Sequence, residues 1–195
     1  MVKTLEQYLR KWHTGKTTLY GCLRKECLPK ETTSDCWVEI LNNEVSEIEQ
    51  LFSASTTFAL DGDSVEKTLE KGVRKPMPTM DIYVFQEEEK APFTLIECKY
   101  RKMLDNSSKN TQTKVSSLYK EVCEKAQSSI QFLKSENYVV REDAFLVMNS
   151  DVAPIVKSNI IFYAAAEEEE NRMKIIVVDT RELYERLKSI RIQGL

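Results

Sequence analysis

Two short apolar runs decide the fold of this chain: Met80-Asp81-Ile82-Tyr83-Val84-Phe85 and Phe93-Thr94-Leu95-Ile96-Glu97-Cys98-Lys99-Tyr100. Both are rich in the β-branched and aromatic residues that favour strands. A polar stretch, 86–90, separates them. We therefore predict two strands, over 80–85 and 93–100, that pair as a β-hairpin.

Three charged residues interrupt these apolar runs. Side chains alternate along a strand, so Glu97 and Lys99 share one face of theirs, while Asp81 begins the neighbouring strand. A hairpin would bring the three to one end of the sheet. Two carboxylates placed so close together repel each other unless a cation lies between them. The pattern predicts a Mg²⁺ or Mn²⁺ site in which Lys99 holds or deprotonates a metal-bound water.

A helix is predicted over 35–53, where apolar residues recur with a helical period. At ~100° per residue, Glu44 falls in the middle of the apolar stripe, between Leu41 and Ile48. A carboxylate on a buried face is costly unless it is paired or binds a metal. Glu44 is therefore our candidate for a further metal ligand.

The remaining elements follow from period and turn signals. Before the hairpin we expect a helix over 4–13, an irregular stretch over 14–34, a strand over 56–60, a turn over 61–63 and a short helix over 64–71. After it we expect a helix over 113–134, strands over 144–148, 160–165 and 174–178, and a closing helix over 181–190. This order predicts an α/β fold with a central mixed β-sheet flanked by helices.

The length of 195 residues suits one domain. Within it we distinguish an N-terminal extension (1–34), a core that carries the motif (35–148) and C-terminal strands and a helix (149–195). No run of ~20 apolar residues is present, so we expect no membrane partner. The N-terminus carries Glu6 and lacks an apolar signal segment, which favours a cytoplasmic location. The odd number of cysteines, five, favours reduced thiols.

The motif resembles that of a known superfamily. An acid-bearing helix, a hairpin with Asp on one strand and Glu-x-Lys on the next, and a further helix resemble the PD-(D/E)XK, or restriction-endonuclease-like, nucleases over roughly 35–148. The resemblance implies that Asp81, Glu97, Glu44 and the backbone carbonyl of Cys98 bind the metal, with Lys99 activating water. The sequence departs from the pattern at Met80, where the family has proline.

Basic residues gather around the motif in the sequence. The net charge of −3 argues against an overall electrostatic grip on nucleic acid, but it does not exclude a local basic groove. Lysines and arginines before and after the hairpin would contact phosphates, or they form an ordinary charged surface. The resemblance also implies a Gln or Lys from the helix after the hairpin. The nucleic-acid-binding candidates are Lys75, Arg101, Lys102, Lys120 and Gln127.

The sequence thus predicts a metal-dependent endonuclease that hydrolyses phosphodiester bonds, with DNA as the expected substrate. The resemblance makes a homodimer plausible. Three alternatives stay open: an inactive nuclease fold that binds nucleic acid or serves as a structural module, an RNA-cleaving enzyme, and a solvated strand edge where Asp81, Glu97 and Lys99 simply meet water.

Overall fold

The structure is a computed structural model, and it describes residues 17–28, 35–64, 78–85, 91–100, 110–135, 137–166, 173–192 and 194–195. The predicted helix over 4–13 and nearly all of the one over 64–71 lie outside the described residues. So do three of the candidate nucleic-acid contacts, Lys75, Arg101 and Lys102.

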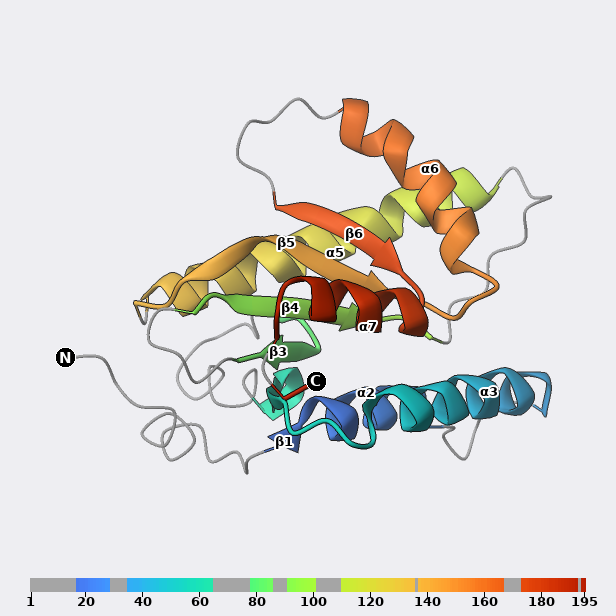
Figure 1. The fold of residues 1–195 in the computed structure, drawn as a ribbon. Coiled ribbons are helices and arrows are strands. Elements are labelled where there is room, and N and C mark those ends of the chain that lie inside the picture. Colours follow the sequence, from blue (N-terminus) through green and yellow to red (C-terminus); the bar gives the residue numbers. More distant parts are fainter. Residues whose placement is uncertain are drawn as a thin grey trace.

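A mixed sheet of six strands forms the centre of the described fold, in the order β1-β2-β3-β4-β5-β6 (Figure 1). Neighbours from β1 to β4 are antiparallel, whereas β4, β5 and β6 run parallel to one another. The strands are β1 (Thr17–Thr18), β2 (Phe58–Asp61), β3 (Ile82–Val84), β4 (Phe93–Cys98), β5 (Val140–Val147) and β6 (Lys174–Val178).

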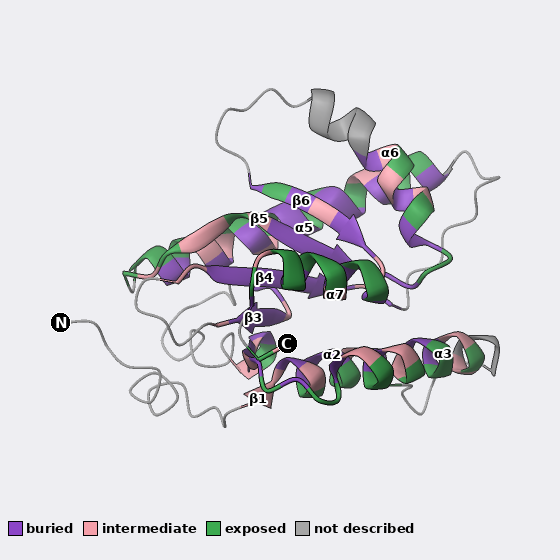
Figure 2. Ribbon diagram, viewed as in Figure 1, coloured by how far each residue is buried: buried purple, intermediate pink, exposed green. Residues whose placement is uncertain are grey.

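Helices cover both faces of this sheet. Their bounds are α2 (Leu19–Cys27), α3 (Asp35–Phe52), α5 (Asn110–Ser135), α6 (Ala153–Ala166) and α7 (Thr180–Ser189). Residues of α5 and α6 share one hydrophobic core with the sheet, and residues of α2, α3 and α7 share a second. The central strands β3 and β4 are buried at every position, and the outward sides of the helices are exposed (Figure 2). The predicted α/β class with a mixed sheet flanked by helices is confirmed.

Strand β4 is buried at every position, because both of its faces are covered. Leu95 belongs to the core beneath α5, whereas Ile96 and Cys98 belong to the core beneath α2, α3 and α7. Since side chains alternate along a strand, Glu97 faces the α5 side with Leu95. The two faces of β4 therefore separate the charged side chain from the apolar core of α3.

The predicted hairpin is confirmed. Strands β3 and β4 pair antiparallel, with Ile82 opposite Ile96 and Tyr83 opposite Leu95. Continued by one residue, this register places Asp81 opposite Glu97. The long helices predicted over 35–53, 113–134 and 181–190 are also present, with ends shifted by three residues or fewer.

Two predictions of local structure were wrong. Residues 160–165 are part of helix α6, not a strand. Their run is apolar without alternation, a pattern that does not distinguish a strand from a buried helix. Asn149 helps to start this helix, because its side-chain oxygen accepts from the Val152 amide and its carbonyl oxygen from the Ala153 amide.

The second error concerns 14–34, predicted as irregular, which contains β1 and helix α2. Thr18 caps α2 by accepting a hydrogen bond from the Gly21 amide. The buried residues of α2 are spaced as on one helical face, namely Leu19, Cys22, Leu23 and Cys27. None of the helices in the described residues is long and apolar enough to cross a membrane.

Gly62 fixes the approach of β2 to the segment that carries Asp81. Its amide donates to the Asp81 carbonyl over 2.7 Å. A Cβ at this position would lie 2.0 Å from the Met80 carbonyl oxygen and 2.9 Å from that of Asp81. Only glycine fits against this backbone.

We expect Gly62→Ala to destabilise the protein by about 2 kcal/mol or more, because backbone must move to admit the methyl group. Gly21→Ala is the matched control. Its Cβ would meet only the Thr18 hydroxyl, at 3.4 Å, and alanine in a helix gains about 0.5–1 kcal/mol over glycine. Chemical unfolding measures both. Equal effects of the two substitutions would contradict this account.

Candidate functional site

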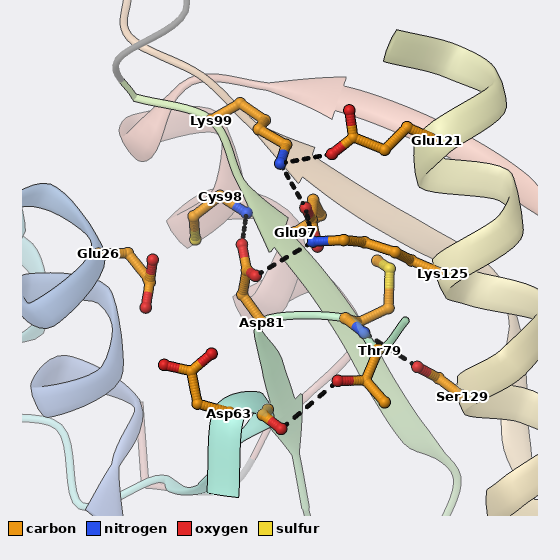
Figure 3. A network of polar contacts seen from close by, with 12 residues as sticks. Glu26, Asp63, Thr79, Asp81, Glu97, Cys98, Lys99, Glu121, Lys125 and Ser129 are labelled. Atoms are coloured by element: carbon orange, nitrogen blue, oxygen red, sulfur yellow. Dashed lines mark hydrogen bonds and ion pairs between the residues drawn. The ribbon is translucent and has the colours of Figure 1, made fainter. Parts of the chain in front are cut away.

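The site is built around Glu97, whose side chain is fully buried, with 0% exposure. One carboxylate oxygen, Oε1, lies 2.9 Å from Lys99 Nζ and 2.6 Å from Lys125 Nζ. Lys99 comes from the end of the same strand and Lys125 from helix α5, so the two ammonium groups approach from different elements (Figure 3). A buried carboxylate needs such partners to remain charged.

Asp81 lies just before β3 and faces the same cluster. Its Oδ2 accepts a hydrogen bond from the Cys98 amide over 2.8 Å, and its Oδ1 lies 3.6 Å from Lys125 Nζ. The structure thus brings together three of the predicted residues, Asp81, Glu97 and Lys99. Cys98 contributes its amide to Asp81, and its side chain is buried on the opposite face.

One ridge of helix α5 contacts successive parts of the site. Glu121 Oε1 accepts from Lys99 Nζ over 2.8 Å. One turn on, Lys125 contacts Glu97 and Asp81, and a further turn on Ser129 Oγ accepts from the Met80 amide over 3.0 Å. These residues are spaced i, i+4 and i+8, so they lie along one side of the helix. The ridge of Glu121, Lys125 and Ser129 therefore positions both strands of the hairpin.

Lys125 was missed by the sequence reasoning, which named Lys120 and Gln127 instead. Both of those are exposed on α5. A signal for Lys125 was present: Leu118, Val122, Lys125 and Ser129 follow each other by four, three and four residues, the spacing of one buried stripe. A lysine on that stripe needs a buried acid as its partner.

The pKa values of the cluster reflect burial opposed by ion pairing. Burial first, and then the neighbouring Asp81, raise the pKa of Glu97 to about 7, against the opposing effect of Lys125 and Lys99. Burial acts to lower the pKa of both Lys99 and Lys125. The attraction of Glu97 outweighs it, aided by Glu121 for Lys99 and by Asp81 for Lys125, so both pKa values are raised. Both lysines therefore act as ammonium donors.

Glu26 is a further acid that the sequence reasoning did not find. It lies in α2 and is directed toward Asp81, with Asp63 beside it (Figure 3). Burial raises the pKa of Glu26, and the charge of Asp81 raises it further. It was missed because 14–34 was predicted as irregular, so no helical face was assigned to it. Glu26 places a third carboxyl group on the side of Asp81 away from α5.

Glu44 is buried, as its helical phase predicted, with 4% exposure. Its neighbours Leu41 and Ile48 belong to the core on the α2, α3 and α7 side of the sheet, opposite to the face of Glu97. Its carboxylate accepts from the Ser150 amide over 2.9 Å and from the Thr180 hydroxyl over 2.8 Å. The structure therefore separates Glu44 from the other three predicted residues and gives it donors of its own.

The donor set is compatible with a hard divalent cation. Asp81 and Glu97 offer carboxylate oxygens, the ligands that Mg²⁺ prefers. Glu97 Oε2 is buried and has no hydrogen-bond partner among the described residues. Within the same residues, no three His, Cys, Asp or Glu side chains are grouped so as to hold a metal ion. Two carboxylates suit an ion that keeps several waters and also binds phosphate.

Comparison with known proteins returned no match to a protein-family model, a curated protein or a solved structure.

Glu44 links α3 to α7 and to the turn after β5. We expect Glu44→Ala to lower the free energy of unfolding by about 1–3 kcal/mol, because the Ser150 amide and the Thr180 hydroxyl lose their acceptor. Glu39→Ala in the same helix is the control, since Glu39 is exposed, and we expect it to change stability by less than about 0.5 kcal/mol. Urea unfolding of both variants measures this. An unchanged free energy of unfolding in Glu44→Ala would refute the expectation.

Ser129 is buried between α5 and the hairpin, where it also shares a 2.8 Å hydrogen bond with the Tyr83 hydroxyl. We expect Ser129→Ala to cost about 1–3 kcal/mol, because the Met80 amide loses its acceptor. Ser117→Ala, an exposed position on α5, should be nearly neutral. Thermal and denaturant unfolding compare the two variants, and equal stability of Ser129→Ala and Ser117→Ala would contradict this expectation.

Proposed function

We propose that this protein is a metal-dependent nuclease, with DNA as its expected substrate and Mg²⁺ or Mn²⁺ as its cofactor. The observation that carries the proposal is the convergence of Asp81 and Glu97 from paired strands, with Lys99 Nζ 2.9 Å from the Glu97 carboxylate. Two acids and a lysine at one end of a hairpin can supply metal ligands and a charge-stabilising donor for metal-assisted phosphodiester hydrolysis.

Asp81 and Glu97 would hold the metal. When bound, the metal would supply Lewis acidity toward a phosphoryl oxygen and a water with a lowered pKa. The buried Glu97 Oε2, without a hydrogen-bond partner in the described part of the chain, supports this assignment. Glu26 lies on the side of Asp81 away from α5 (Figure 3). It is not grouped with Asp81 and Glu97 so as to hold a metal ion, so these two acids are the proposed ligands among the described residues.

Lys99 would orient the attacking water or a phosphate oxygen. Its ammonium group is held from two sides by Glu97 and Glu121. A raised pKa keeps the proton on Lys99 and favours hydrogen-bond donation over proton abstraction. The role that the structure supports for Lys99 is therefore positioning and charge stabilisation at the reacting phosphate.

The order of elements agrees with the resemblance to the restriction-endonuclease-like nucleases. Helix α3 precedes the hairpin of β3 and β4, α5 follows it, and β5 then pairs in parallel with β4. This is the order of helix, hairpin and helix on which the resemblance rests. The agreement supports, at the level of topology, the nuclease core as our proposal for the fold.

A second candidate is a structural ion-pair cluster without catalysis. Lys99 and Lys125 balance Asp81 and Glu97 in charge, and buried networks of this kind also occur for structural reasons alone. Cleavage of RNA is the third, since the same groups serve both nucleic acids.

The decisive test is cleavage of plasmid, branched DNA and single-stranded RNA in the presence of Mn²⁺ or Mg²⁺. We expect the wild type to cut in a metal-dependent way. Asp81→Asn, Glu97→Gln and Lys99→Ala should each reduce the cleavage rate about a hundredfold or more, because each removes a charged group that binds the metal or positions the reacting phosphate. Asp151→Asn, an exposed acid, is the matched control. Circular dichroism establishes that each variant is folded. Absence of cutting by the wild type on every substrate, or full activity of the three variants, would reject the proposal.

A further inference from the structure

We propose that Lys125 is a displaceable internal cation of this site: a divalent metal takes its place on Asp81 and Glu97. This inference rests on the metal site of the proposed function. It assigns to Lys125, which is not among the candidate residues of the sequence, the role of the cation that the metal displaces.

The contacts of Lys125 coincide with those expected of the metal. Its Nζ lies 2.6 Å from Glu97 Oε1 and 3.6 Å from Asp81 Oδ1. One positive group thus reaches the two acids proposed as ligands, and it does so from α5 across the face of the hairpin (Figure 3). A divalent cation bound to the same oxygens would repel an ammonium left in this position.

The partners of the two lysines indicate which one must move. Lys99 shares Glu97 Oε1 with Lys125 but also binds Glu121 at 2.8 Å, and Glu121 is not a proposed ligand. Lys99 therefore keeps one ion pair when metal binds. The contacts shown for Lys125 are both to proposed ligands, Glu97 and Asp81, so it loses both together. Lys125 is the residue for which metal and ammonium compete.

Lys125 can leave without a change of fold. Its side chain is 19% exposed, and a lysine side chain has a flexible four-carbon stem that carries its charge toward water. Neighbouring Ser129 and Glu121 hold α5 against the hairpin through separate contacts. A small rotation of the Lys125 side chain therefore opens the acids while α5 stays in place.

The first experiment measures Mg²⁺ affinity by isothermal titration calorimetry at about pH 8, where free carboxylates are ionised. The proteins are wild type, Lys125→Met, Lys125→Gln and the control Lys134→Met, which removes an exposed charge from the same helix. We expect both Lys125 variants to bind Mg²⁺ about tenfold more tightly than wild type, because charge-assisted hydrogen bonds contribute a factor of about ten or more to such an equilibrium. Lys134→Met should match the wild type.

The second experiment uses the unmodified protein and does not depend on the folding of variants. Amine acylation followed by peptide mass spectrometry compares Lys125, Lys99 and Lys134 with and without Mg²⁺. We expect Mg²⁺ to increase labelling of Lys125, while Lys134 is unchanged and Lys99 remains protected by Glu121.

Unchanged labelling of Lys125 in saturating Mg²⁺, or equal or weaker Mg²⁺ binding by the folded Lys125 variants, would overturn the inference. Metal binding with displacement of Lys125 but without cleavage would support it and reject the nuclease proposal alone. Binding by the variants and not by the wild type would also support it. Absence of Mg²⁺ binding by all four proteins would overturn both proposals.

Discussion

The burial of the Glu97 carboxylate near the end of strand β4 is the constraint on which the rest of the site depends. A charged group with no exposure is tolerated only beside groups of opposite charge or strong donors, and here two ammonium groups meet one of its oxygens. One comes from the strand and one from α5, so the charge of Glu97 ties the helix to the hairpin. Asp81 contacts Lys125 on one side of the cluster, and Glu121 contacts Lys99 on the other.

Among the described residues two acids are buried, Glu44 and Glu97, and the protein holds them in different ways. Glu44 receives hydrogen bonds from a backbone amide and a hydroxyl, neutral donors that are fixed by α7 and by the turn after β5. Glu97 is held by ammonium groups on flexible side chains. Neutral, fixed donors join layers of the fold permanently, whereas a mobile cation can be exchanged for another cation. The two buried acids therefore differ in the kind of donor that holds them, although both are glutamates on buried faces.

Prediction from the sequence fails where one residue pattern is compatible with two different structures. The apolar run 160–165 fits a strand and a buried helix equally, and the Asn149 cap with the packing against the sheet selects the helix. The short helix α2 was overlooked because 14–34 was predicted as irregular, although the Thr18 cap and four buried positions specify it. Glu26 lies in this helix and was missed for the same reason. Lys125 was not among the candidates on this helix, which were Lys120 and Gln127, although its spacing from Val122 and Ser129 places it on the buried stripe.

By itself the sequence determined the hairpin, because alternation and β-branched residues are local properties, and it placed Asp81, Glu97 and Lys99 at one end of the sheet. It also determined that Glu44 is buried, since helical phase is local too. Only the tertiary structure decided which face each acid occupies and which cations reach it. Helix α3 packs on one side of the sheet and α5 on the other, and no periodicity within either segment encodes that choice, because the side a helix takes depends on chain connection and on packing against distant residues.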